Sequence, residues 1–109
     1  MKIQTAGALR RRLTLEAPSR SGDEGGAAAI TWSAIGSVWA AVIPRIGREI
    51  VTADGQAARV THEIEIRWRD DVTAAMRFRD GVAIYAIHAV HQRDELRRRL
   101  VCLVEELAP

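Results

Sequence analysis

Apolar and ionic side chains alternate without interruption along residues 62–69, which read HEIEIRWR. One side of this pattern is apolar or aromatic and consists of His62, Ile64, Ile66 and Trp68. The other side is wholly ionic and consists of Glu63, Glu65, Arg67 and Arg69. A period of two residues is typical of a β-strand with one buried face. We therefore predict a strand whose apolar side lies in the core and whose ionic side faces outward.

Two further strands are predicted before this one. Residues 10–17, RRRLTLEA, place Leu13 and Leu15 between polar neighbours and end at Pro18, and the following SRSGDEGG is typical of a surface hairpin or loop. Residues 38–43, VWAAVI, carry no charge on either face, so this strand is covered on both sides or lies in an interface. The uncharged stretch 25–44 is long enough for a membrane span, but its glycines, serines and alanines favour two short strands around a turn at Gly36 and Ser37.

The second half of the chain contains the strongest hairpin signal. Asp80 and Gly81 form the dipeptide that suits a two-residue type I′ turn, with residues 76–79 and 82–90 as the two arms. Residues 45–59 show no clean period and predict a long loop, which could carry one short helix over residues 49–53. The C-terminal segment 95–107 fits a helical stripe slightly better than a buried strand.

Short strands spaced about ten residues apart indicate an all-β, mainly antiparallel fold. We expect a small β-barrel or sandwich with a long inter-strand loop at residues 45–59 and at most a short helix. The chain of 109 residues is short enough for us to expect one domain over residues 1–109.

The charge, the single cysteine and the N-terminal residues restrict which functions the chain could have. A net charge of +2 is a mild excess of base, whereas a chain that neutralises many phosphates is normally more basic. Cys102 is the only cysteine, which excludes an internal disulfide, and its place in LVCLV indicates a buried side chain. The first twelve residues have no apolar signal region, so we expect cytoplasmic synthesis and no membrane association.

Catalytic and metal-binding motifs are sparse. His88 and His91 are three residues apart, so a regular strand would point them to opposite faces and prevent joint metal binding. The adjacent carboxylates fall in predicted turns or ends, where solvent exposure is usual. We therefore expect no enzyme, no catalytic residue, no metal site and no cofactor.

Two binding functions remain open from the residue pattern. Arginine is interleaved with aromatic residues in RWR and RFR, as in small barrels that bind single-stranded nucleic acid, although the arginines and rings of one strand face opposite ways. The mixed charges of Glu63, Glu65, Arg67 and Arg69 suit a contact in which the acids of one copy meet the bases of the next. A merely solvated ionic face explains the same residues equally well.

The order of motifs resembles the head-to-tail joining proteins of long-tailed bacteriophages, the adaptor, stopper or head-closure family also found in phage-like gene transfer agents. The matching positions are Gly7, residues 9–15, Thr31, Trp32, residues 38–40, Pro44, residues 47–49, residues 61–69, Met76, Arg77, residues 85–87, Asp94 and residues 100–102. Within the family pattern, Glu63 replaces a residue that is often basic and Trp68 replaces a tyrosine.

This resemblance implies a structural, non-enzymatic virion subunit with a small β-barrel fold, and it favours a strand over residues 100–104. It implies a homo-oligomeric ring at the head–tail junction, with a portal or adaptor ring above, tail proteins below and DNA passing without sequence-specific binding. The predicted loop at residues 45–59 would reach the channel or a neighbouring ring. The candidate interface residues are Arg45, Arg48, Glu49, Arg59, Glu63, Glu65, Arg67 and Arg69. The alternative function is that of a free-standing small β-barrel that binds nucleic acid.

Overall fold

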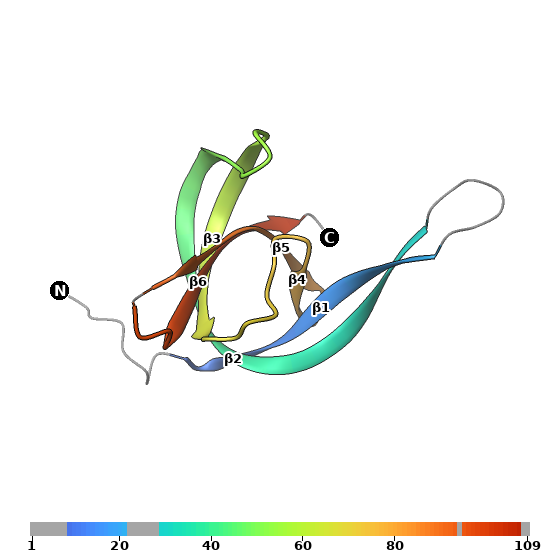
Figure 1. Cartoon of the computed structure of the whole chain (residues 1–109), viewed down its shortest axis with the longest axis horizontal. Helices are drawn as coiled ribbons and strands as arrows, with labels where there is room; N and C mark the ends of the chain where they lie inside the picture. Colours follow the sequence, from blue (N-terminus) through green and yellow to red (C-terminus); the bar gives the residue numbers. More distant parts are fainter. Residues whose placement is uncertain (1–8, 22–28, 94, 108–109) are drawn as a thin grey trace.

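The structure of the protein is a computed structural model that describes residues 9–21, 29–93 and 95–107. Its strands are β1 (Arg11–Ser21), β2 (Ala29–Val51), β3 (Ala57–Arg67), β4 (Arg77–Asp80), β5 (Ala83–Gln92) and β6 (Arg99–Leu107). Neighbouring strands are antiparallel, and the order β1-β2-β3-β6-β5-β4 closes into a barrel through the pairing of β4 with β1 (Figure 1). The predicted all-β antiparallel fold is confirmed, and the described residues contain no helix.

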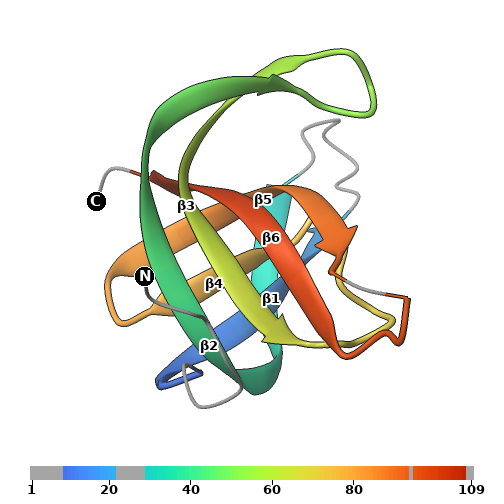
Figure 2. The ribbon, with the colours of Figure 1, turned by 90° about the vertical axis from the view of Figure 1, so that its left-hand side faces the viewer.

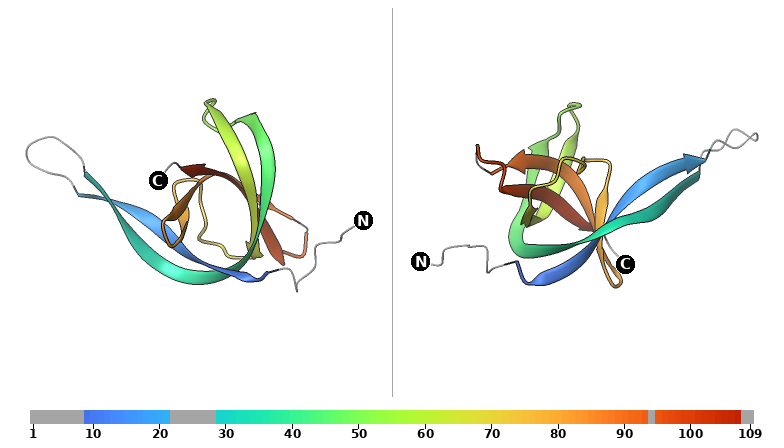
Figure 3. Two further views of the ribbon diagram at one scale, coloured as in Figure 1. Left: turned by 180° about the vertical axis from the view of Figure 1, so that it is seen from behind. Right: turned by 60° about the horizontal axis from the view of Figure 1, so that its bottom comes forward.

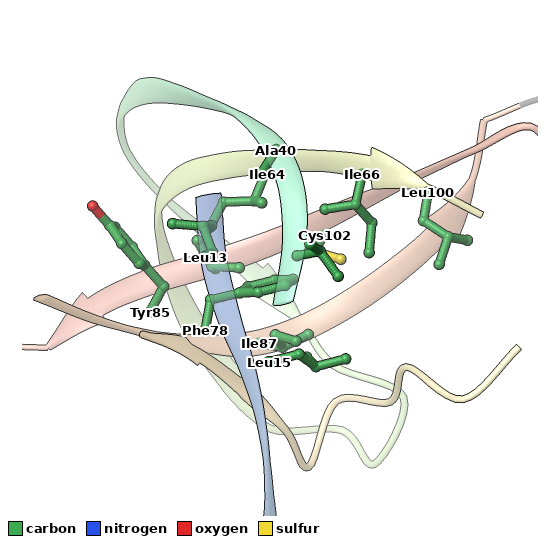
Figure 4. Close-up of a cluster of buried hydrophobic side chains, with 12 residues drawn as sticks. Leu13, Leu15, Ala40, Ile64, Ile66, Phe78, Tyr85, Ile87, Leu100 and Cys102 are labelled. Atoms are coloured by element: carbon green, nitrogen blue, oxygen red, sulfur yellow. The ribbon is translucent and has the colours of Figure 1, made fainter. Parts of the chain in front are cut away.

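The barrel core is formed by the inward faces of all six strands. Ile64 and Ile66 are completely buried, and Trp68 lies partly buried against the same cluster, so the predicted apolar side of residues 62–69 is confirmed. The Phe78 ring is also fully buried. Figure 4 shows it in the middle of the cluster, with Tyr85 toward one end and Leu100 toward the other.

The C-terminal segment is strand β6, which confirms the strand that the family resemblance implies over residues 100–104, whereas the slight preference for a helix from the leucine spacing is wrong. β6 pairs with β3 on one side and with β5 on the other. Its inward side chains Leu100, Cys102 and Val104 fill the core at a period of two residues. Pairing with β3 on one edge and β5 on the other overrides the local helical spacing of the leucines.

β2 is one strand of 23 residues, so the predicted turn at Gly36 and Ser37 is wrong. A bulge occurs there instead, because Leu15 pairs with Gly36 while Glu16 pairs with Ala34, which leaves Ile35 as the extra residue. A Cβ atom at Gly36 would lie 3.3 Å from Arg69 Nη1. The glycine therefore allows the Arg69 guanidinium to lie close to the backbone of β2, and the chain does not reverse direction there.

Residues 45–59 form an extension of β2 and β3, here called the β2–β3 arm, and not a loop or a short helix. Pro44 pairs with His62 and Arg48 with Val60, so Arg45, Ile46 and Gly47 bulge opposite a single residue of β3. The two strands then pair as far as Val51 and Ala57. Figures 1 and 2 show this arm rising from the barrel and curving over one side of it.

A second extension, here called the β1–β2 arm, consists of residues 17–21 of β1 and 29–33 of β2. It is two-stranded, because β4 pairs with β1 only from Thr14 to Glu16. Figure 3 shows the two arms leaving the barrel in different directions. The loop predicted over residues 19–26 falls mostly outside the described residues, and Ser19–Ser21 are strand.

The hairpin predicted around Asp80 and Gly81 is confirmed, but its turn lies one residue further along. Asp80 pairs with Ala83, so Gly81 and Val82 are the two turn residues. Gly81 has a φ of 62° at the first central position, which is the arrangement of a type II′ turn rather than type I′.

Candidate assembly surfaces

The acids on the outer face of β3 form ion pairs within the subunit. Arg45 binds Glu63 through two contacts, Nη2 to Oε1 at 3.2 Å and Nε to Oε2 at 3.1 Å. Arg48 lies 3.9 Å from the same carboxylate. The hydrogen bond with Glu63 raises the pKa of Arg45. The bulge in β2 positions these two arginines over β3, and the three residues form one cluster at the base of the β2–β3 arm.

Glu65 is also paired, and it is buried although it lies on the outer face. Its carboxylate accepts a hydrogen bond from Arg93 Nη1 at 2.6 Å, and the residue is 6% exposed. Arg69 binds Asp71 through two hydrogen bonds of 2.9 and 2.8 Å, which lower the pKa of Asp71. Arg67 is exposed and makes no ion pair within the described ranges. Most of the mixed-charge face is therefore neutralised inside one copy.

The remaining candidate residues lie on the β2–β3 arm. Glu49 and Arg59 are directly opposite each other and exposed. The Arg59 guanidinium crosses Gly47, because a Cβ atom there would lie 2.8 Å from Arg59 Nε. Ile46, in the bulge, is 95% exposed and Val51, near the tip, is 75% exposed. The eight candidates thus differ in pairing and in exposure, and sequence reasoning missed the two exposed apolar residues because the arm has no period.

The tip of the arm is ordered by its own hydrogen bonds. Thr52 N–H donates to the Gln56 carbonyl at 2.8 Å, and Gly55 N–H donates to the Thr52 carbonyl at 2.9 Å. Gly55 has a φ of 87°, which suits glycine at this turn. The Thr52 hydroxyl also binds Asp54 and lowers the pKa of that carboxyl group. The arm therefore ends in a tight, defined turn.

A groove separates the arm tip from the barrel wall. Two adjoining hollows of about 420 and 480 Å³ share Thr52, Ala53, Ala74 and His88 in their lining. His88 and His91 both line the larger hollow, because a bulge at His88 changes the phase of β5. The regular strand on which the prediction for these histidines depended is therefore interrupted, and the two side chains do not face opposite ways. His88 Nε2 lies 3.0 Å from Glu105 Oε1, and no group of three metal-ligating side chains occurs in residues 9–21, 29–93 and 95–107.

The base of the β1–β2 arm is held by a buried ionic cluster. Glu16 accepts hydrogen bonds from Arg77 Nε at 2.7 Å and from Arg79 Nε at 3.1 Å. The Arg77 guanidinium lies 4.1 Å from the centre of the Trp32 ring. Burial raises the pKa of Glu16, but the hydrogen bonds from Arg77 and Arg79 outweigh it and the net shift is downward. Sequence reasoning did not find this cluster, because its members come from three strands.

Cys102 faces the core between β3 and β5, as its apolar neighbours predict. Burial raises the pKa of its thiol to about 12. At neutral pH the group is therefore the protonated thiol and a poor nucleophile. Over the described part of the chain, no helix has the length and apolar character needed to cross a membrane.

The described residues thus form a closed antiparallel barrel with two projecting arms, and several of its charged side chains are paired within the subunit. The chain belongs to the phage head completion protein family, whose model matches residues 5–107. It is a structural protein of phage or phage-like particles, and the resemblance to head-to-tail joining proteins is confirmed.

Two solved structures are similar to the chain over most of its length. A chain from the virion of a native gene transfer agent particle is 31% identical, with 90% of this chain and 94% of that chain covered and a TM-score of 0.69. The solution structure of protein SF1141 from Shigella flexneri 2a is 27% identical, with 96% and 98% covered and a TM-score of 0.71. None of the curated proteins compared with the chain matches it.

Proposed function

We propose that this chain is a connector subunit that forms a homo-oligomeric ring at the head–tail junction. Portal or adaptor proteins would lie above the ring and tail proteins below it, and the ring would retain packaged DNA or let it pass. Its role is structural rather than enzymatic. The observation that carries the proposal is the pair of arms, each of which extends beyond the strands that support it in the barrel.

The β2–β3 arm supports assembly through its exposed apolar residues. Ile46 and Val51 are 95% and 75% exposed, and water is an unfavourable environment for such large aliphatic side chains. Arg48 and the exposed Glu49 lie between them in β2, so the arm combines apolar and ionic contacts as interfaces do. A neighbouring subunit that covers Ile46 would remove its side chain from water without disturbing the barrel.

The two arms point in different directions (Figure 3), so one copy carries two separate projecting surfaces, both of which a head-to-tail contact between copies can use. In such a contact one surface of a copy meets a different surface of the next copy. A closed ring results when the rotation between neighbouring copies adds up to a full turn. The likeness to a chain from the virion of a gene transfer agent particle supports a place in the particle itself.

Localisation in particles tests the proposal directly. Electron microscopy of purified particles bound to antibodies against this chain should show label at the junction of head and tail. Particles made without the chain should appear as DNA-containing or emptied heads and separate tails, and supplying the chain in trans should restore joined particles. Absence of the chain from mature particles, or label confined to the capsid surface, would contradict the proposal.

A substitution in the arm separates assembly from folding. Ile46→Asp places a charge on a side chain that touches almost nothing in the subunit, so the melting temperature should stay close to that of the unchanged protein. Joined particles should nevertheless fall at least tenfold. Val82→Asp, on an 84% exposed turn residue, is the matched control and should leave joining unchanged. Equal yields from both variants would remove the arm from the interface.

The ionic face of β3 offers a second, narrower test. Glu65 is unsuitable for charge reversal, because it is buried against Arg93 and its replacement would disturb the fold. Arg67 is exposed and unpaired within the described residues, so Arg67→Glu should fold normally. A loss of joining in this variant assigns the face to a contact needed for joining, and full joining removes the face from that contact.

A further inference from the structure

We propose that one row of side chains on the outside of the barrel, here called the arginine row, binds the phosphodiester backbone of DNA. The row consists of Arg12 on β1, Trp39 on β2, Arg67 on β3 and Arg99 on β6. The proposal adds a DNA contact to the proposed function. It rests on that function in one respect, which is that DNA is present at the junction. It does not require ring formation.

The strand register places these four residues side by side. Arg12 pairs directly with Trp39, and Arg67 pairs directly with Arg99. Ala40 pairs with Ile66, so the preceding Trp39 and the following Arg67 are neighbours across β2 and β3. The inward neighbours Ala40, Ile66 and Leu100 are buried, which puts the row on the outer face. Adjacent strands are about 4.8 Å apart, so the row spans roughly 14 Å.

Trp39 gives the row an aromatic platform. Its side chain is 51% exposed, and the Arg12 guanidinium lies 5.6 Å from the ring centre. Beside it is a hollow of about 220 Å³ lined by Ser37, Val38, Trp39, Arg67 and Arg69. The hollow has room for a phosphate and part of its sugar, with a hydroxyl and guanidinium groups around an apolar floor. An exposed ring next to arginines is the arrangement that small barrels use to hold nucleic acid strands.

The charges of the row are not neutralised within the subunit. Arg12, Arg67 and Arg99 make no ion pair within residues 9–21, 29–93 and 95–107. Arg99 Nη1 is buried and has no hydrogen-bond partner there, so Arg99 adds positive charge to the row although this nitrogen does not reach the surface. The nearby acids are already engaged, since Asp71 binds Arg69 and Glu65 binds Arg93. Like charges directly opposite on neighbouring strands repel each other, as at Arg67 and Arg99. A ligand with repeated negative charge would relieve that repulsion.

In the arginine row the aromatic ring and the arginines come from different strands, so they can share one face. Arg67 and Trp68 are adjacent in one strand and therefore face opposite ways, and Trp68 indeed lies against the core. The ring that shares a face with Arg67 is Trp39, which a different strand supplies. DNA is favoured over an acidic protein because a repeating phosphate can engage several guanidiniums of the row while Trp39 contacts a base or sugar.

Fluorescence anisotropy of the purified chain with labelled 20-nucleotide single-stranded and 20-base-pair duplex DNA tests the proposal. Binding at about 50 mM salt should weaken steeply by 200 mM. Arg12→Ala with Arg67→Ala should weaken binding at least tenfold and reduce the salt slope by about 1.8 on duplex or about 1.4 on single strands. Arg20→Ala with Arg59→Ala removes the same charge from the arms and should have less than a threefold effect.

Trp39→Ala tests the aromatic platform. It should weaken single-strand binding about fivefold or more, and Trp39→Phe should restore most of the affinity. A larger loss on single strands than on duplex supports base stacking, and equal losses support a contact to the sugar and phosphate only. Unchanged melting temperatures exclude unfolding as the cause.

Three results would overturn the proposal: no salt-sensitive complex, an equal loss in the arm control, or binding of poly-glutamate without binding of DNA. None of them bears on whether the chain occupies the head–tail junction, which microscopy of particles decides separately.

Discussion

Glu16 provides the sharpest test of the energetics of the β1–β2 arm. Its side chain is 11% exposed, against 14% for Arg77 and 37% for Arg79. Glu16→Gln keeps the shape but removes the charge that both guanidiniums face. Removal of one partner from a fully buried pair costs about 3–5 kcal/mol, and an exposed pair contributes about 0.5 kcal/mol. Because Arg79 is partly solvated, we expect a loss of about 2 kcal/mol at pH 7, or roughly 10 °C in melting temperature.

The pH dependence of this loss has a defined sign. The pKa of Glu16 is lower in the folded chain than its ordinary value of 4.5. The folded state therefore holds fewer protons on this group, and its stabilisation is complete above about pH 5. That stabilisation disappears as the pH falls through the lowered pKa. The difference between Glu16→Gln and the unchanged protein should accordingly narrow below about pH 4.

Urea unfolding followed by tryptophan fluorescence from pH 7 to the lowest pH at which the protein stays folded measures both effects. Glu49→Gln, an exposed glutamate on the other arm, is the matched control and should change stability by less than about 0.5 kcal/mol. A loss below 0.5 kcal/mol for Glu16→Gln at pH 7, or one that stays constant as the pH falls, would refute the role assigned to the cluster.

Three further predictions concern the barrel itself. Gly81→Ala should destabilise the fold by about 1 kcal/mol in urea unfolding, because the φ of 62° is strained for alanine, whereas Gly→Ala at a negative φ lacks this penalty. Cys102 should resist a thiol reagent at pH 7.5 in the folded chain and react at once in urea, since its buried thiol has a pKa of about 12; fast labelling of the native protein would contradict this. Ile64→Ala should cost about 3 kcal/mol, because the side chain is fully buried in the core, and a loss under 1 kcal/mol would show that the site collapses around the deletion.

The sequence predicted strands best where one face is buried in the barrel. Ile64 and Ile66 alternate with charged residues because the β3 segment has a core on one side and solvent or ion pairs on the other. The β2–β3 arm beyond Pro44 has no such contrast, since most of its residues are exposed on both faces. Without a buried face there is no period to detect, which is why residues 45–59 were predicted as a loop.

The candidate site was harder to predict because its contacts join distant strands. Arg93 reaches Glu65 only because β5 and β3 both flank β6. Trp39 and Arg67 become neighbours only through the pairing of β2 with β3. The bulges at Ile35 and His88 also shift the inward–outward alternation of their strands by one residue. A face assigned to a side chain from regular alternation is therefore wrong beyond each bulge. Local patterns contain none of this information.

The length of β2 restricts how this chain can evolve. Between Gly36 and Pro44 the strand pairs with β1 up to Ala40 and with β3 from Ala40 onward, so the gain or loss of one residue there would turn every later side chain to the opposite face. The two bulges of β2 are the points within it where an extra residue is already accommodated. Natural insertions and deletions should therefore collect where the arms end, while the barrel keeps one fixed length.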